Sequence, residues 1–582
     1  MARHTTALSA LALVTVLATA ACSSGSGSPS GEGSPSAGGG NSTSATSGAT
    51  SAGFQSEHKG GTLTLLSDGA SGTLDPQINY TNQYWNLYQN VYDGLLKFRW
   101  GVDGAASQQV VPDLATGMPK VSDGGKSYTF TLRRGIKFSN GQEVTVAAVL
   151  ASFQRMFKIS SPNAGSWYQY IVGASKCLKT PATCTLKGGL IVNPKTNQIT
   201  FKLTQPDPEF NYQLATPFAV ILPKGSPDKD AGDTPLPSTG PYKFASYNPS
   251  RQLVMVRNPY FHVWSQAAQP QGYPDKIIYK FTLDAESQVS AIENGQADWM
   301  FTPPPADRLN EIGTKYADRV HVHALSAFWY AALNVNIPPF NNLKARQAIN
   351  WGIDRADTVR LFGGTEVATP VCTILPPGFP GHVDNCQYTK GGGTTWKAPD
   401  LAKARKLVQE SGTAGQPVTV IAESYSTAKA MGEYLQSLLN SLGYKASLKL
   451  LSQNVEFTYI QNTNNKVQIS VTQWYADYPA ASDFLQVLLS CENFHPHSDA
   501  SVNISGFCNK SIDAQMNQAE SLMLSNPAKG NQMWAKIDQE MMRQSPVVPM
   551  FTPHEVDFTS KRVGNFHFSR QFFVCLDQLW VK

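Results

Sequence analysis

Short runs of alternating apolar and polar residues recur along the chain, and segments with apolar residues at helical spacing lie between them. Alternation with a period of two predicts strands, and a spacing of three to four residues predicts helices. The predicted strands are 62–66, 128–132, 199–203, 253–256 and 467–471. The predicted helices are 86–98, 285–294, 343–354, 401–411 and 430–442, and the fourth has Asp400 as N-cap and Gly412 as C-cap. Together the elements predict a mixed α/β protein.

Length and composition narrow the class of protein. A chain of 582 residues is too long for one compact core, so we expect two or three domains. The 46 glycines and 37 prolines indicate many loops. The 47 basic and 42 acidic residues nearly balance and form no basic stripe, so we expect no nucleic-acid partner.

The N-terminal region has the features of an export signal rather than of a folded domain. Residues 7–21 are almost all small or aliphatic and too few to span a bilayer, which predicts a signal peptide over 1–21. The run ends in Thr19-Ala20-Ala21-Cys22, which resembles a bacterial lipoprotein cleavage site with Cys22 as the lipidated residue. The alternative is ordinary cleavage nearby, with Cys22 incidental. Residues 22–53 are rich in Ser and Gly and are expected to form a disordered tether after the lipid anchor.

The remaining cysteines form three close pairs and one single residue. In an exported protein this spacing predicts the disulfides 177–184, 372–386 and 491–508, that is Cys177 with Cys184, Cys372 with Cys386 and Cys491 with Cys508. Cys575 lies in an apolar run and is expected to be a buried free thiol. A metal site is the competing interpretation, but no CxxC occurs and no Cys has a His at finger-like spacing. We therefore expect neither a metal nor a cofactor.

Six segments carry distinctive residues in a characteristic order. They are Gly60-Gly61-Thr62 with Asp75-Pro76 and Asp93-Gly94; 112–157 with its Arg133-Arg134-Gly135; Ser238-Thr239-Gly240-Pro241-Tyr242 with Asn258-Pro259; 288–298; 334–355; and Gln473-Trp474-Tyr475-Ala476-Asp477-Tyr478-Pro479. Their order resembles that of the extracellular solute-binding proteins of family 5, the peptide and nickel class that serves ABC importers. Most of these residues suit turns and core positions, so the pattern indicates a fold and no chemistry by itself.

The resemblance implies a two-lobed, periplasmic-binding-protein-like clamshell (type II-like) with an additional domain in the first lobe. The implied parts are lobe one at 54–88, 220–322 and 552–582, the additional domain at 89–219, and lobe two at 323–551. It also implies a monomeric receptor on the extracellular face of the bacterial membrane. Such a receptor would capture a solute, with an oligopeptide expected first, and deliver it to the permease subunits of an ABC importer.

The same resemblance proposes a ligand site around Asp477. In peptide-binding members the Asp of this motif pairs with the peptide α-ammonium, and Asp477 matches it. The other proposed ligand-binding residues are Gln473, Trp474, Tyr475, Trp329, Trp167, Tyr80, Thr81 and Asn82. The alternatives are that Asp477 caps the turn at Tyr478-Pro479 and that the aromatic residues pack in the core. No second cationic residue stands out for a peptide carboxylate, which leaves the identity of the ligand open.

Two further classes of function were weighed. Within the same fold, the ligand could be a chelated metal, an oligosaccharide or an opine-like solute. A secreted serine hydrolase is the other class, because Ser426–Lys429 and Ser226–Lys229 fit SxxK, but no Lys-Thr-Gly follows. Phe558 interrupts an HExxH motif, and His495 and His497 with Asp499 lie in a stapled loop. We expect no enzymatic activity.

Overall fold

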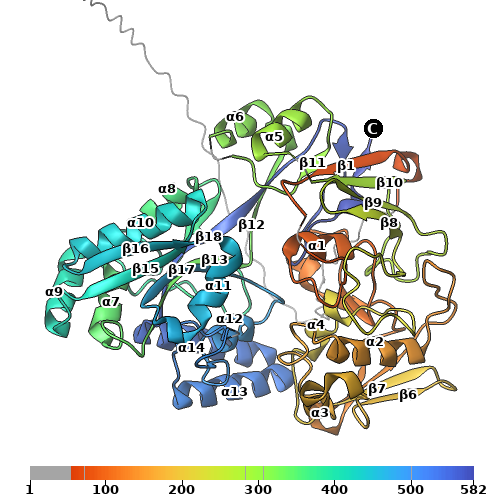
Figure 1. Ribbon diagram of the computed structural model, residues 1–582, viewed down its shortest axis with the longest axis horizontal. Coiled ribbons are helices and arrows are strands. Elements are labelled where there is room, and N and C mark those ends of the chain that lie inside the picture. Colours follow the sequence, from red (N-terminus) through yellow and green to blue (C-terminus); the bar gives the residue numbers. More distant parts are fainter. Residues whose placement is uncertain (1–53, 71, 282, 306, 500) are drawn as a thin grey trace, which may run out of the picture. The chain divides into compact units, whose positions relative to one another are not determined.

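The computed structural model describes residues 54–582 except 71, 282, 306 and 500. The predicted signal peptide, Cys22 and the tether therefore lie outside the described residues. The described chain forms three larger sheets with helices packed against them (Figure 1). Within it, no helix has both the length and the apolar character needed to cross a membrane.

The first sheet has five strands in the order β11-β1-β10-β9-β8. Strand β1 pairs in parallel with β10 and β11, and β9 pairs antiparallel with β10 and β8. Apolar residues of α5 and α6 pack with those of β1 and β11. The bounds are β1 Thr62–Leu66, β8 Tyr242–Asn248, β9 Gln252–Arg257, β10 Lys276–Lys280, β11 Trp299–Met300, α5 Ala285–Glu293 and α6 Leu309–Lys315.

The second sheet lies within the predicted additional domain and has four strands in the order β4-β5-β7-β6. Phe130 and Phe153 pack edge-on against Phe201, which joins this sheet to helix α2. The bounds are β4 Lys120–Ser122, β5 Ser127–Thr131, β6 Leu190–Asn193, β7 Gln198–Lys202, α2 Val146–Lys158, α3 Ala174–Lys179 and α4 Phe210–Gln213.

The third sheet has seven strands and is covered by helices on both faces. Every residue of its central strand β13 is buried, and alternate side chains belong to two different apolar clusters. Helices α7, α9 and α10 complete one cluster, and α12, α13 and α14 complete the other. The strands are β12 Val320–Ala324, β13 Ala327–Leu333, β14 Ala368–Pro370, β15 Pro417–Glu423, β16 Lys445–Leu451, β17 Ile469–Tyr475 and β18 Val547–Phe558.

The helices of this region and the short strand pairs complete the fold. The helices are α7 Leu343–Gly352, α8 Arg355–Phe362, α9 Leu401–Ser411, α10 Ser426–Ser441, α11 Gln453–Gln461, α12 Ser482–Leu489, α13 Lys510–Ser525 and α14 Pro527–Gln544. The short pairs are β2 Leu96–Phe98 with β3 Val110–Pro112, β19 Val563–Gly564 with β22 Trp580–Val581, and β20 Phe568–Ser569 with β21 Phe573–Val574.

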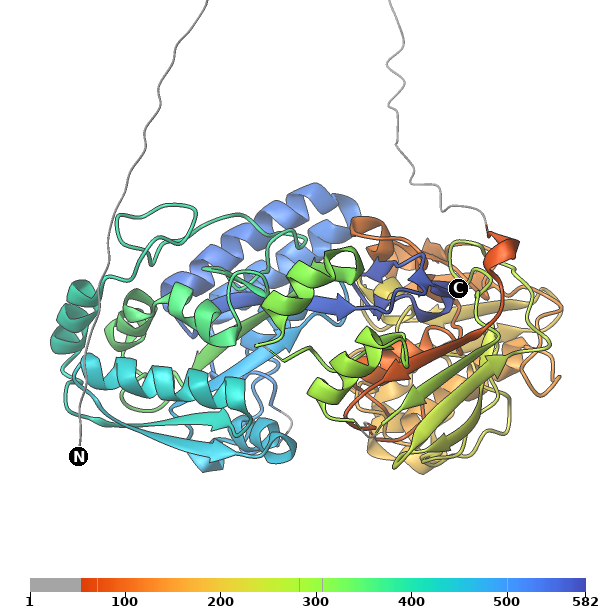
Figure 2. The ribbon, with the colours of Figure 1, turned by 90° about the horizontal axis from the view of Figure 1, so that it is seen from above.

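A long-range strand contact links the seven-stranded sheet to the five-stranded one, next to the edge strand β12 of the former. Strand β12 pairs antiparallel with the end of β18, from Val320 opposite Phe558 to Ala324 opposite His554. Beyond this pair, Trp299 of β11 forms a bridge with Thr559 and donates its indole N–H to Asp557 Oδ1 at 2.7 Å. In Figure 2 the blue ribbon of β18 leads toward the C-terminal residues. The predicted lobe boundaries near 323 and 552 fall inside strands β12 and β18.

Most predicted elements are present within a few residues of their expected bounds, and one is wrong. Helix α9 matches its prediction, with the Asp400 carboxylate accepting from the Lys403 N–H at 3.0 Å and Gly412 at φ +68°. The predicted helix 86–98 is instead α1, Asn82–Tyr88, followed by a turn and strand β2. Residues 83–98 are all buried, so their apolar spacing reflects burial on every side rather than one helix face.

The three predicted disulfides are present in the structure. They join Cys177 to Cys184, Cys372 to Cys386 and Cys491 to Cys508, across 7, 14 and 17 positions of sequence. Cys575 is buried and unbonded, as expected for a free thiol in an apolar segment.

A buried ion pair fixes helix α2 to the segment before α1. Arg155 Nη1 donates to Asp75 Oδ1 at 3.0 Å and to Gln77 Oε1 at 2.8 Å, and its Nη2 also bonds the Asp75 carboxylate. Its remaining N–H groups reach the carbonyls of Pro227 and Lys229. Because every charge has a partner, this pair can be buried at low cost.

We expect Arg155→Met to destabilise the protein strongly, because Asp75 would stay buried without a counter-charge. The expected loss in the free energy of unfolding is about 3–5 kcal/mol, measured by urea denaturation. Lys158→Met is the matched control on the same helix, since Lys158 pairs with the exposed Asp228. That control should cost about 1 kcal/mol or less, and similar losses for the two variants would contradict the prediction.

Candidate functional site

A cavity of about 600 Å³ is lined by two distant parts of the chain. One side comes from residues 163–213 in the predicted additional domain, including the loop before α4. The other side comes from residues 474–524, which include α12 and the exposed end of α13. Tyr80, just before α1, completes the lining. A space of this volume is large enough for a small organic ligand.

Asp477 lies on the wall of this cavity, two residues beyond the end of β17. Its Oδ1 accepts the Tyr80 hydroxyl at 2.5 Å, and its backbone N–H donates to Asp483 Oδ2 at 2.9 Å. Burial raises the pKa of Asp477 to about 7, and the Tyr80 hydrogen bond opposes that shift. Among the described residues no backbone N–H donates to its carboxylate, so the geometry does not show the turn-capping role.

The next residue explains why Asp477 points into the cavity. Tyr478 is buried, stacks on Tyr212 and packs edge-on against Trp167. These contacts anchor the chain between β17 and α12 to the opposite side of the cavity. Gln571 adds a hydrogen bond at 2.6 Å from its side-chain amide to the Asp477 carbonyl. The backbone at Asp477 is thus fixed from both sides.

A second group of carboxylates lines the same cavity, and we call Asp207, Glu209 and Glu520 the acidic wall. Glu209 accepts the hydroxyl of Ser482, at the start of α12, and shares a hydrogen bond with Glu520. The Glu209 N–H donates to Asp207 Oδ1 at 2.9 Å. Burial, reinforced by the charge of Glu209, raises the pKa of Asp207 to about 7, and burial also raises the pKa of Glu209 and Glu520.

These carboxylates have no positive partner from the protein. Among the described residues that line the cavity, none is Lys, Arg or His. Some buried carboxylates elsewhere in the chain are paired with a cation, namely Asp75 with Arg155, Asp93 with Lys97, and Asp298 with Arg562. Others are not, and burial raises the pKa of Asp557 to about 7 and that of Glu456 to about 8. A carboxylate held away from water must bind a proton or meet a cation. A cation that entered the cavity would meet carboxylates for which the described lining supplies no competing positive charge.

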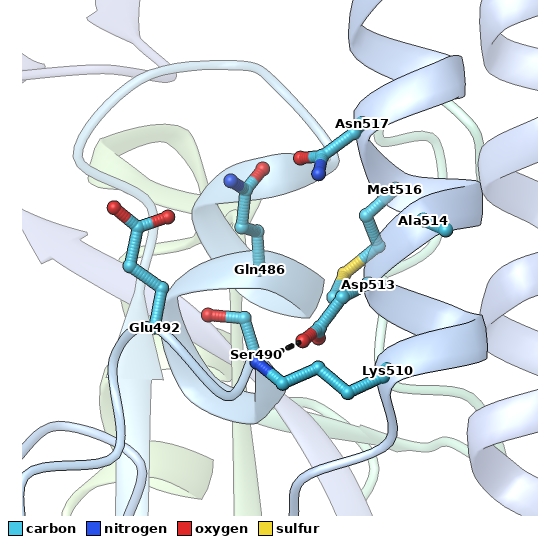
Figure 3. A pocket seen from close by; sticks show the side chains of 8 residues that line it. All are labelled: Gln486, Ser490, Glu492, Lys510, Asp513, Ala514, Met516 and Asn517. Carbon is cyan, nitrogen blue, oxygen red and sulfur yellow. Dashed lines mark ion pairs between the residues drawn. The ribbon is translucent and has the colours of Figure 1, made fainter.

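A lysine, Lys510, lines a smaller adjacent pocket of about 270 Å³ (Figure 3). Lys510 lies beside Asp513 there, with Nζ 3.6 Å from Oδ2. The two pockets share Gln486, Glu492 and Asn517. Lys510 thus carries its own counter-charge and does not line the larger cavity.

The structure separates the residues proposed from sequence into two groups. Tyr80, Trp167, Trp474 and Asp477 line the cavity together. The remaining five lie elsewhere: Trp329, Gln473, Tyr475, Thr81 and Asn82.

Each of these five has another position in the fold. Trp329 is 4% exposed and stacks on Phe551 in the core. Gln473 stands opposite Trp329 in the β13–β17 ladder, and Tyr475 ends β17. Thr81 precedes α1, and Asn82 is its first residue.

The sequence analysis missed the acidic wall. Asp207 and Glu209 stand among Pro206, Pro208 and Phe210, so two carboxylates in an apolar, proline-rich loop were a usable signal. Glu520 gave no such signal, because an acidic residue in a polar stretch of helix α13 is ordinary. Within the described part of the chain, no group of His, Cys, Asp and Glu could hold a metal ion. In the His495–Asp499 loop, Asp499 instead accepts from Asn462.

Comparisons with known proteins define the class. Residues 109–496 match the family model described as "Bacterial extracellular solute-binding proteins, family 5 Middle". The chain belongs to this family of solute-binding proteins. Members are receptors for ABC transport and not enzymes, so the chain is a solute-binding protein that hands its ligand to transporter permeases.

Particular relatives share most of the chain. The glutathione-binding protein GsiB of Salmonella choleraesuis is 28% identical over 506 residues, which is 85% of this chain and 89% of GsiB. The clavulanic acid biosynthesis oligopeptide binding protein 2 superposes with a TM-score of 0.79 at 22% identity, covering 90% of this chain and 96% of its own. DppA from Helicobacter pylori, solved with the peptide STSA, superposes with a TM-score of 0.71 at 20% identity. The match covers 90% of this chain and 99% of DppA. These structures show the shared two-lobed fold.

The raised carboxylate pKa values predict that the ligand-free protein loses stability as pH rises. A carboxyl whose folded pKa lies above its unfolded value stabilises the fold below pH ~4, and that contribution is lost as pH rises through the folded pKa. For Asp207 and Asp477 the folded value is about 7. The thermal midpoint should therefore decrease as the pH is raised from about 5 to about 8. The decrease should be at least about 2 °C, which is roughly the effect of 1 kcal/mol in a domain of about 150–250 residues.

Asp207→Asn tests whether the Asp207 carboxyl contributes to this pH dependence of the thermal midpoint. The amide keeps the acceptor for the Glu209 N–H but does not titrate, so the fall in midpoint should become smaller. Asp228→Asn, at an exposed carboxylate, is the matched control and should leave the slope of thermal midpoint against pH unchanged. An unchanged slope in Asp207→Asn would show that other groups cause the pH dependence.

Proposed function

We propose that this solute-binding protein captures an oligopeptide with a free amino terminus, and that Asp477 binds the peptide α-ammonium. The observation that supports this most is a carboxylate on the wall of a cavity whose described lining contains no cation. The Tyr80 hydroxyl donates to the Asp477 carboxylate and keeps it oriented. An ammonium group would supply the charge that Tyr80 cannot.

The aromatic residues suit the flanks of such a ligand. Tyr80, Trp167 and Trp474 line the cavity, and Tyr80 packs edge-on against Trp167. Aromatic faces provide large contact areas with little loss of side-chain entropy, whatever side chains the peptide has.

Strand β17 offers a further feature of peptide recognition. It pairs with β13 along its whole length, but with β15 only through Ile469 and Ser470. Among the described strands, none pairs with the second edge of residues 471–475. An extended peptide could add to that edge through main-chain hydrogen bonds. Gln473 and Tyr475, which do not line the cavity, would then contact the ligand through their backbone.

The relatives are consistent with a peptide ligand. GsiB is named for glutathione, a tripeptide thiol, and DppA from Helicobacter pylori was solved with a peptide. The other structural relative is named as an oligopeptide binding protein. What these names share is an amide-linked ligand, and we extend only that to this chain.

We also propose that the receptor is a monomer built from two lobes and tethered to the outer face of the membrane. Lobe one would comprise 54–88, 220–322 and 552–582, the additional domain 89–219, and lobe two 323–551. The cavity then lies between the additional domain and lobe two. The signal peptide 1–21, a lipid on Cys22 and the tether to residue 53 would hold this body near its importer, in keeping with an extracellular family.

Asp477→Ala should weaken binding of an unmodified peptide by roughly 30-fold or more. Removing one member of a buried charge pair costs about 2–5 kcal/mol, and about 1.4 kcal/mol corresponds to a tenfold change in affinity. N-acetylation of the peptide should weaken binding to the wild type by a similar factor. It should add little in the variant, because the same interaction is already lost. Calorimetry on the four combinations measures the coupling.

Trp474→Ala is the control for general damage to the cavity. It should weaken acetylated and free peptides equally, since it removes packing and no charge. If the losses from Asp477→Ala and acetylation add, Asp477 acts only on the local backbone. If the wild type binds acetylated peptide with full affinity, the ligand does not bind through its amine.

Cys22→Ala should release the protein into the medium, because the thiol that accepts the lipid would be absent. The measurement is an immunoblot of membrane and medium fractions from the producing cells. Ser23→Ala, one position along, is the matched control and should remain with the membrane. Retention of the Cys22→Ala protein in the membrane fraction would disprove the lipid anchor.

A further inference from the structure

The acidic wall and Asp477 lie at opposite sides of the first turn of α12. Ser482 donates its hydroxyl to Glu209 of the wall. The next residue, Asp483, accepts the backbone N–H of Asp477. One short helical turn thus connects the two groups of carboxylates, and both line a single cavity. A ligand that occupies this cavity can meet both.

One ammonium group cannot neutralise this cavity. Five carboxylates line it: Asp207, Glu209, Asp477, Glu492 and Glu520. Glu492 is exposed to water, so four of them remain to be neutralised. The N-terminus of α12 offers only about half a positive charge. With a peptide α-ammonium at Asp477, the acidic wall would still depend on bound protons. A second positive group on the ligand would replace them.

A buried amide on the same lining points to the rest of the ligand. Asn163 is 8% exposed, and its Oδ1 accepts from the Ser166 hydroxyl at 3.2 Å. Its Nδ2 is buried and makes no hydrogen bond of standard geometry among the described residues, although the Asn163 side chain lies near the Tyr80 hydroxyl. An unsatisfied donor of this kind is costly unless a ligand supplies an acceptor. A peptide carbonyl is such an acceptor. Protonation of the carboxylates alone would neutralise their charge but would bring no acceptor to Asn163.

We infer that the acidic wall is a second cation subsite, which binds the ammonium or guanidinium of a basic side chain in the captured peptide. This inference rests on the proposed function, because it assigns the side-chain charge of the same peptide whose amino terminus Asp477 binds. It makes the receptor selective for lysine- or arginine-containing peptides over neutral and acidic ones. Glutathione, with two carboxylates, is a poor match for this lining.

The test compares lysine peptides with norleucine peptides, which have the same side-chain length without the charge. Calorimetry on the wild-type protein uses the three tripeptides with Lys at position one, two or three and Ala elsewhere, and their norleucine matches. At one position or more, the lysine peptide should bind at least about 10-fold tighter than its match. The three positions are needed because the geometry does not fix the register of the peptide.

The double variant Glu209→Gln/Glu520→Gln assigns the preference to the acidic wall. It should bring the lysine and norleucine affinities to within about twofold of each other, because the carboxylates that distinguish the two side chains are gone. A cooperative thermal transition shows that the variant is folded. Asp513→Asn is the matched control, because Asp513 is paired with Lys510 outside the cavity, and it should keep the full preference.

The outcomes separate this inference from the proposed function. If none of the six peptides binds the wild type, the peptide-binding proposal fails, and this inference fails with it. If the peptides bind but lysine is not preferred at any position, or if the double variant keeps the preference, only the acidic-wall inference is overturned. If the double variant does not fold, Asp207→Asn replaces it, and an undiminished preference there overturns the inference as well.

Discussion

The dominant physical constraint in this protein is the burial of carboxylates without a counter-charge. Removing an isolated ionised carboxylate from water is so costly that the group takes up a proton or finds a cation. Away from the cavity the chain supplies the cation for some of these groups, as Arg155 does for Asp75, whereas Asp557 has a pKa of about 7. Around the cavity it supplies none, and Asp207 and Asp477 respond with a pKa of about 7. What distinguishes the cavity is that several such carboxylates line one space that a ligand can enter.

The rest of the architecture serves to bring this lining together. Packing on both faces of β13 makes the seven-stranded sheet rigid, so the end of β17 can present Asp477 at a fixed place. Tyr478 anchors that chain segment to aromatic residues of the predicted additional domain. Tyr80 approaches from the segment that the Asp75–Arg155 pair holds. Three regions far apart in sequence thereby share one cavity.

The family fold and the ligand preference have separate physical origins. The family is recognised from residues that make turns and cores, and these determine how the chain folds and how it serves a transporter. The charge of the ligand depends instead on side chains at the cavity wall, which can differ among relatives with the same fold. GsiB shares 28% of its aligned residues with this chain, so its named ligand does not define the cavity here.

The sequence alone determined what local patterns encode. Alternation and caps predicted β1 and α9, the pairing of close cysteines matched the disulfides, and a motif singled out Asp477. Local patterns failed at 86–98, where burial on all sides imitates a helical period. They also could not reveal the acidic wall, because Glu209 and Glu520 are about 310 residues apart. Whether a carboxylate is paired or isolated depends on which groups surround it in space, and only the tertiary structure decides that.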